Sequence, residues 1–136
     1  MNSKSLFWLL ATFFLTTAPL AAAQQPTKVP RIGHLTGTLP SANSARREAF
    51  RQGLRELGYV EGKNIIIEWR SAEGKFDRLP ALAAELVRLK VDIIVSGGPQ
   101  STRPTKEATS TIPIVMAQDS DPVGNGFIAS LARPAM

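Results

Sequence analysis

Short apolar runs alternate with amphipathic stretches along most of the chain, which is the pattern of strands and helices that follow one another in turn. The apolar runs are rich in branched residues and are bounded by glycine, proline or polar residues, as strands usually are. The predicted strands cover residues 29–36, 64–70, 91–96 and 112–116. In the remaining stretches, apolar residues recur every three or four positions. They predict helices over residues 41–57, 77–90, 101–109 and 123–132.

This alternation predicts an α/β fold with a doubly wound parallel sheet, built from right-handed strand-helix-strand units. The run VDIIVS at residues 91–96 is almost continuously apolar, as in a strand covered on both faces. The run NIIIEWR at residues 64–70 has one apolar face and one mixed face. We therefore expect residues 91–96 in the middle of the sheet and residues 64–70 at an edge.

The predicted helices carry expectations about capping and burial. Asp77 is expected to cap the second helix. The buried stripe of that helix is expected to consist of Leu79, Leu82, Leu86 and Leu89. Pro104 is expected in the first turn of the third helix, because a proline deeper inside removes a hydrogen bond. The first helix is expected to bury an apolar face. That face would consist of Ala42, Ala45, Ala49, Phe50, Leu54 and Leu57.

The first 23 residues have the order of an export signal. Lys4 precedes an apolar run over residues 6–15, and Ala21 and Ala23 supply the small side chains that a signal peptidase requires. We expect cleavage after Ala23 and a periplasmic product. No cysteine follows the small residues, so attachment of a lipid through cysteine is not expected.

Net charge and cysteine content bear on which partners and which kinds of site the chain can have. The formal net charge of +5 would suit a nucleic-acid partner, but the arginines of the first predicted helix are interleaved with glutamates, which indicates a mixed solvated face. The absence of cysteine excludes disulfides and thiolate metal sites. After a linker over residues 24–28, residues 29–136 are long enough for one domain with its own core.

Glycine and polar residues follow the first, third and fourth predicted strands, at the edge where open parallel sheets bind ligands. The glycines would let a ligand approach the backbone, Ser101 and the helix start beside it could hold a carboxylate, and the aspartates could hold an amine. Turn and capping roles explain each residue equally well in isolation, and their convergence favours binding. The candidate ligand-binding residues are Thr36, Gly37, Gly97, Gly98, Ser101, Asp119 and Asp121.

Signals for catalysis are weak. The chain has no nucleophile elbow and no Walker A loop, and its single histidine, His34, cannot build a catalytic triad or a histidine metal cluster. We expect His34 to be structural. Residues 124–129 fit the pattern G-x-G-x-x-A, but they follow the fourth strand instead of the first, so they do not predict a nucleotide site. No catalytic residue, metal or cofactor is predicted.

The segment AFRQGLRELGYVEGKNIIIEWRSAEGKFDRLPALAAEL, residues 49–86, resembles the substrate-binding proteins of ABC transporters, in the subfamily that includes the tryptophan-type binding protein. The resemblance continues through KEAT at 106–109, IPIV at 112–115, DPVG at 121–124 and SLARP at 130–134. It implies a type I periplasmic-binding fold, in which two hinged α/β lobes close on a small organic solute and present it to a membrane permease. The full-length family is expected to be monomeric.

By this resemblance, residues 29–136 would form part of the first lobe of such a protein, and an amino acid is the expected class of solute. Nucleic acid is not an expected partner. Family members continue past the position of Pro134 into another strand and a second lobe, so the chain is expected to be an amino-terminal portion. Two alternatives stay open. One is a non-functional truncated fragment, and the other is a small exported flavodoxin-like enzyme or sensor.

Overall fold

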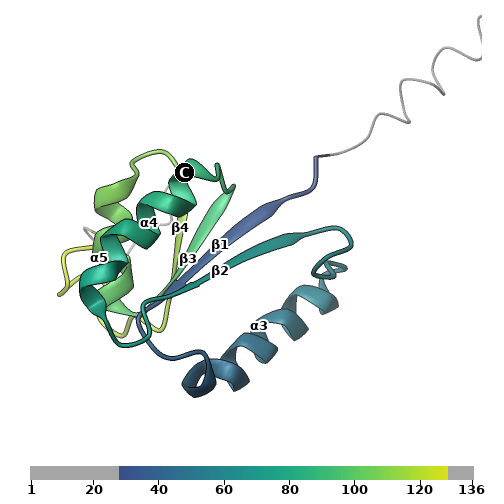
Figure 1. Cartoon of the computed structure of the whole chain (residues 1–136), viewed down its shortest axis with the longest axis horizontal. Coiled ribbons are helices and arrows are strands. Elements are labelled where there is room, and N and C mark those ends of the chain that lie inside the picture. Colours follow the sequence, from purple (N-terminus) through teal and green to yellow (C-terminus); the bar gives the residue numbers. More distant parts are fainter. Residues whose placement is uncertain (1–27, 129–136) are drawn as a thin grey trace, which may run out of the picture.

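The structure, a computed structural model, describes residues 28–128, and these residues form one parallel sheet with helices on both faces (Figure 1). The predicted signal and its cleavage site lie outside the described residues. The four strands stand in the order β2-β1-β3-β4. Their bounds are Arg31–Thr36 for β1, Ile66–Ser71 for β2, Ile93–Gly97 for β3 and Ile114–Ala117 for β4. The predicted edge position of β2 and central position of β3 are both confirmed.

Helices lie on opposite faces of this sheet, as a doubly wound fold requires. One face carries α3 (Ser44–Glu56), and the other carries α4 (Leu79–Arg88) and α5 (Pro99–Ala108) (Figure 1). Short 3-10 turns, Ser41–Asn43 and Phe76–Arg78, precede α3 and α4. Within residues 28–128, no helix has the length and apolar character needed to cross a membrane.

The hydrophobic core lies between the sheet and α4. Its buried members are Leu35, Ala72, Leu79, Ala83, Leu86, Val91 and Ile94. The predicted buried stripe of α4 is therefore confirmed at Leu79 and Leu86, while Leu82 and Leu89 are only partly buried against this core. The approach of α4 to the sheet is close because β1 has a glycine, Gly33, opposite Leu86.

Gly33→Ala is expected to lower the free energy of unfolding by about 1 to 2 kcal/mol, because an added methyl group overpacks this contact. A Cβ at Gly33 would lie 3.0 Å from both terminal carbons of Leu86. Urea unfolding followed by circular dichroism measures the change. Gly53→Ala in α3 is the matched control, since nothing lies within 4 Å of its Cβ position, and it is expected to stabilise the helix by up to about 1 kcal/mol. Equal effects of the two substitutions would contradict the close contact.

The expected apolar face of α3 is wrong in most of its positions. No residue of α3 is fully buried, and Leu57, just after the helix, is 75% exposed. Ala42, Ala45 and Ala49 are also exposed. Contacts with Trp69 of β2 hold the helix on the sheet instead. Two of them come from arginines, which a hydrophobic pattern counts as polar.

Pro104 lies inside α5, where the sequence predicted it only for the first turn. The helix begins at Pro99, two residues before the predicted start at Ser101, so Pro99 and not Pro104 lies in the first turn. The interior proline leaves one carbonyl without its helical partner, and hydroxyl groups add other bonds to the helix backbone. Thr105 Oγ1, for example, donates to the carbonyl of Ser101 at 2.7 Å.

The predicted cap at Asp77 is also wrong. Asp77 lies within the 3-10 turn Phe76–Arg78, so the residue before α4 is Arg78, and the helix has no side-chain cap hydrogen bond. The 3-10 turn satisfies part of the helix start itself, since the amide of Leu79 bonds to the carbonyl of Phe76.

The helix predicted over residues 123–132 is absent from its described part. Residues 122–126 form a series of turns. Gly126 adopts a φ of 74°, in the left-handed region that ends a right-handed helix. Residues 129–132 of that prediction lie outside the described residues.

Candidate functional site

The carboxyl ends of the four strands bring the predicted loops to one edge of the sheet. Thr36 of β1 stands in register with Ser71 of β2 and with Gly97 of β3, and Gly97 stands in register with Ala117 of β4. The amide of Gly98 donates to the carbonyl of Ala117 at 2.9 Å. The loops after β1, β3 and β4 therefore lie side by side, as the parallel sheet predicted.

The loop after β1 is buried at its start and becomes exposed at Thr38. The hydroxyl groups of Thr36 and Thr38 are hydrogen-bonded at 3.0 Å. Gly37 is buried, and the ring of Phe76 occupies the space where a side chain would stand, with Cε1 only 2.5 Å from the Cβ position. The absence of a side chain at Gly37 thus accommodates an aromatic ring of the same chain.

The loop after β3 turns sharply into α5. Gly98 has a φ of 103°, which favours glycine, and it immediately precedes the helix. Ser101 is fully buried in the first turn, and its Oγ has no hydrogen-bond partner among residues 28–128. Its hydroxyl is enclosed, so in this conformation the backbone of the helix start, and not the Ser101 side chain, borders the edge.

The two aspartates of the loop after β4 have different roles. Asp121 caps a turn, because its Oδ1 accepts a hydrogen bond from the amide of Gly124 at 2.9 Å. Asp119 is half-buried, and its Oδ1 accepts a hydrogen bond from Asn125 Nδ2 at 3.0 Å. The other oxygen of Asp119, Oδ2, is buried and finds no partner in the described part of the chain. Asp119 is therefore the carboxylate that is oriented but unsatisfied.

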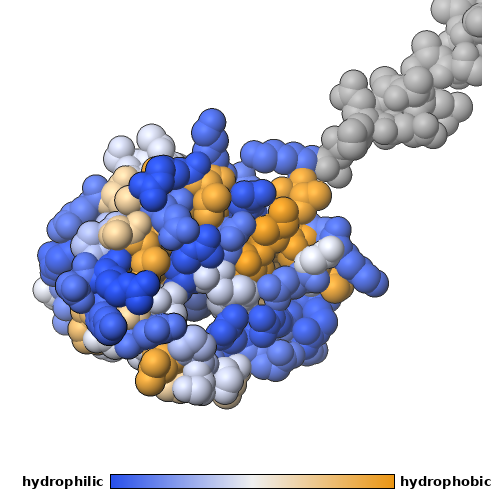
Figure 2. All heavy atoms as spheres, viewed as in Figure 1, coloured by the Kyte–Doolittle hydropathy of each residue, from blue (hydrophilic) through white to orange (hydrophobic). Residues whose placement is uncertain are grey.

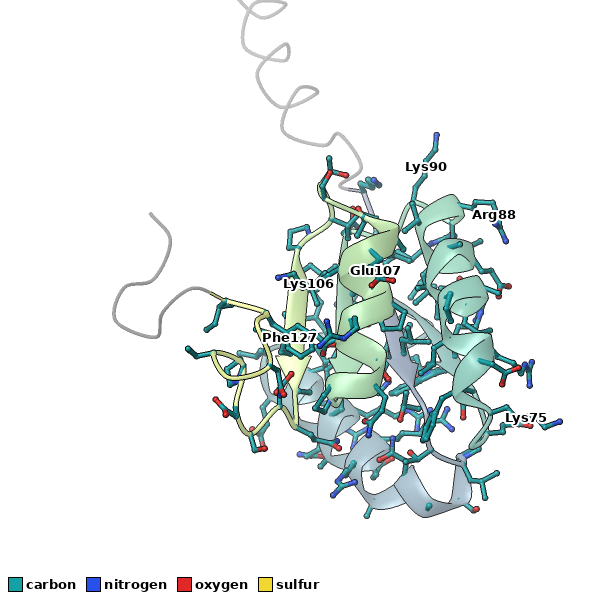
Figure 3. All side chains as sticks on the ribbon, turned by 90° about the vertical axis from the view of Figure 1, so that its left-hand side faces the viewer. Lys75, Arg88, Lys90, Lys106, Glu107 and Phe127 are labelled. Atoms are coloured by element: carbon teal, nitrogen blue, oxygen red, sulfur yellow. The ribbon has the colours of Figure 1, made fainter. Side chains whose placement is uncertain are left out.

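Basic residues of α5 hold the segment that orients Asp119. Arg103 donates to the carbonyl of Asn125 at 3.4 Å, and Lys106 donates to the carbonyl of Phe127. Both cations also lie over the Phe127 ring, with Arg103 Cζ 5.4 Å and Lys106 Nζ 5.9 Å from its centroid. Figure 3 shows Lys106 and Phe127 against each other beside α5. The position of Asn125, and through it that of Asp119, is thus set by α5.

Sequence reasoning missed three residues at this edge. Asn43 is 2% exposed, and within the described residues its Oδ1 has no partner and makes no cap bond to α3. Gln118, directly after β4, has a φ of 66°, which is uncommon for a residue with a side chain and frequent near functional sites. Phe76 comes from the loop after β2, which the sequence did not single out. Because asparagine is common just before a helix, nothing in the sequence distinguishes Asn43 from an ordinary helix cap.

His34 lies away from this edge, in an aromatic cluster under α3. Its ring centroid is 4.8 Å from that of Trp69 and 5.6 Å from that of Phe50. Burial, together with the nearby Arg47 guanidinium, lowers the pKa of His34 to about 4, so the ring is neutral at pH 7. These contacts agree with the structural role expected for it. Among residues 28–128, no three histidines or carboxylates group closely enough to hold a metal ion.

Known proteins match both the sequence and the fold. The family model for the ABC transporter substrate binding protein matches residues 40–136. A tyrosine-binding protein from Clostridioides difficile (strain R20291) is 33% identical over 95 residues, which are 70% of this chain and 27% of that protein. The ligand-free, open structure of a substrate-binding protein with adhesive properties from Clostridium difficile superposes with a TM-score of 0.72 at 29% identity, over 78% of this chain and 36% of that one.

A third relative shares the fold at lower sequence identity. It is the ABC domain in complex with L-Trp from Streptococcus pneumonia, with a TM-score of 0.72 and 23% identity over 79% of this chain and 36% of that chain. The chain described here spans about a third or less of the length of each of these relatives.

Proposed function

The chain belongs to the family of ABC transporter substrate-binding proteins, and from that premise we propose that it supplies one side of a site that captures an aromatic amino acid for a membrane permease. The family consists of transport proteins and not of enzymes, and its members act outside the cytoplasm. The relatives named for tyrosine and crystallised with L-Trp support an aromatic amino acid as the solute. An amino-terminal export signal ending at Ala23 fits this location.

Asp119 carries the proposal. A buried carboxylate oxygen without a hydrogen-bond partner is costly, because the charge has lost water and gained nothing in return. Asp119 Oδ2 is such an oxygen, and Asn125 fixes the orientation of the carboxylate through Oδ1. The ammonium group of an amino acid would supply both the missing hydrogen bond and the missing positive charge. Because Oδ2 is buried in this conformation, the loop after β4 has to open to admit the ammonium group.

The start of α5 suits the other end of the amino acid backbone. Helix amino termini carry partial positive charge and attract carboxylates. This one begins after Gly98, between the loop that contains Thr36 and Gly37 and the loop that contains Asp119. Pro99 has no amide hydrogen, and the amides of Ser101 and Thr102 already donate to the carbonyl of Gly98. The solute carboxylate is therefore assigned to the Gln100 amide and the partial positive charge of this helix start, with Gly97 and Gly98 allowing close approach.

Asp119→Asn is expected to weaken binding of L-tyrosine and L-tryptophan by about tenfold or more, since it removes a charge-assisted hydrogen bond. Amide chemical shifts of residues 24–136 titrated with each amino acid give the dissociation constants. Asp121→Asn is the matched control, because it makes the same chemical change but retains the oxygen that accepts from Gly124.

N-acetyl-L-tryptophan provides a second control, since it lacks the ammonium group. It is expected to bind the wild-type chain weakly and the Asp119→Asn chain equally weakly. The assignment of Asp119 is wrong when the two aspartate variants lose affinity to the same extent, or when acetylation of the solute costs nothing. A wild-type chain that binds no amino acid would remove the proposed binding activity altogether.

A further inference from the structure

Phe76 is a large aromatic residue left half-exposed at the ligand edge of the sheet, with 51% of its surface accessible. Most other exposed large apolar residues lie elsewhere. Figure 2 shows hydrophobic residues gathered beside the point where the grey segment joins β1, at the opposite, amino end of the strands. Exposed residues near that end include Val29, Leu57, Tyr59, Val60 and Ile66.

The loop that presents Phe76 is fastened to the loop after β1. The amide of Gly74 donates to the carbonyl of Gly37 at 2.7 Å, and the hydroxyl of Ser71 donates to the carbonyl of Thr38. Glu73, with a φ of 54°, and Gly74, with a φ of 82°, turn the chain sharply between these bonds. Glycine adopts this left-handed region freely, whereas for Glu73 it costs energy that surrounding contacts have to offset.

The ring of Phe76 packs directly on the backbone of Gly37. Its Cε1 and Cδ1 atoms lie 2.5 and 2.8 Å from the position that a Cβ of Gly37 would take. The preceding residue, Lys75, points away from the domain (Figure 3). About half of the Phe76 surface stays exposed, so the part of the ring that does not cover Gly37 is open to a ligand.

We propose that Phe76 is a specificity-determining residue, an aromatic wall against which the side-chain ring of the solute packs. This inference rests on the proposed function and adds the group that would select aromatic amino acids. Gly37 follows β1, and Asp119 follows β4, two strand spacings or about 10 Å along the sheet. One amino acid fits between them when its ammonium bonds to Asp119 and its ring packs on Phe76.

A purely structural role for Phe76 is the competing explanation. The ring would then only cover Gly37 and the start of α4, and its loss would change stability without changing the choice of solute. Preference among solutes separates the two roles, because aromatic pairs gain energy beyond simple burial while an aliphatic solute does not benefit from them.

Phe76→Leu is expected to weaken binding of L-tryptophan and L-tyrosine by about fivefold and to leave binding of L-leucine unchanged. The measurement is the same amide-shift titration of residues 24–136. Tyr59→Leu is the matched control, because it removes another exposed aromatic ring near the opposite edge, and it is expected to change no affinity. Leucine retains the apolar volume, and unfolding curves of both variants report whether the fold is kept.

Gly37→Ala tests the position of the Phe76 ring without changing Phe76, since the added methyl group must displace the ring. It is expected to weaken aromatic binding by a similar factor, and the double variant is expected to be no weaker than either single one, because both disturb one contact. Amino acid binding with no aromatic preference, or a preference that survives Phe76→Leu, would overturn the role of Phe76 while leaving the proposed function standing. The absence of binding by any amino acid would overturn both.

Discussion

Trp69→Ala is expected to lower the free energy of unfolding by about 3 kcal/mol and to loosen α3 from the sheet. Three residues of α3 contact the Trp69 indole. The guanidinium carbons of Arg47 and Arg51 lie 4.3 and 5.0 Å from its ring centroid, and the Phe50 ring lies 5.9 Å away. Since Trp69 is only partly buried, the estimate stands at the lower end of the range for removal of a large aromatic residue.

Hydrogen bonds through Glu61 also fix the orientation of the Trp69 indole relative to α3. Trp69 Nε1 donates to Glu61 Oε1 at 2.9 Å, and the other oxygen of Glu61 accepts from Arg51 Nε at 2.6 Å. Arg51 of α3 and Glu61 of the following turn are thereby fixed beside the indole. Trp69→Phe retains a smaller ring for the arginines and removes the hydrogen bond, so it is expected to lose about 1 to 2 kcal/mol, less than Trp69→Ala.

Urea unfolding followed by circular dichroism at the helix band measures these effects, because Trp69 is the only tryptophan after the predicted signal and fluorescence is lost in the variants. Leu57→Ala is a suitable control, since this residue is 75% exposed beside the same helix. A Trp69→Ala chain as stable as the Leu57→Ala chain would show that α3 is held by other contacts.

The attachment of α3 also shows where prediction from the sequence succeeds and fails. The period of three and four residues located the helix correctly, because backbone geometry imposes that period on any buried face. The residues that form the contact were misjudged. Alanines of the expected face lie in solvent, while Arg47 and Arg51 contribute through flat guanidinium groups that stack on an aromatic ring.

At the carboxyl ends of the strands, the sequence predicted which loops lie together but not what each residue of those loops does. Parallel strands place their following loops together, so Thr36, Gly97 and the loop after β4 had to meet. Asp119 and Asp121 could not be told apart, because the hydrogen bond that turns Asp121 toward Gly124 depends on the local turn geometry. Phe76 was missed because its position over Gly37 arises from a contact between two loops that are far apart in the sequence.

The stability of the domain is expected to fall by about 3 kcal/mol as the pH drops from 7 to 4, on account of His34. Burial of the ring, 6% exposed, and the charge of Arg47 lower its pKa from 6.5 to about 4 in the folded chain. Between pH 6.5 and 4, His34 is protonated in the unfolded chain but stays neutral in the folded chain. The unfolded state is therefore favoured as the pH falls, and stability is complete only above pH 6.5.

His34→Phe isolates this effect, because phenylalanine fills the same aromatic cluster and does not titrate. Burial raises the pKa of Glu61, but hydrogen bonds from Arg51 and Trp69, with the charges of nearby arginines, outweigh it and leave the pKa below its usual value. Such carboxylates also make the domain less stable in acid, but they contribute equally to the wild-type and variant chains. The difference between the two unfolding free energies, measured at steps of pH from 7.5 to 4, is expected to change by about 3 kcal/mol in favour of the variant. A constant difference over this interval would mean that the folded domain protonates His34 freely, and the ring would then have to be reachable by water beneath α3.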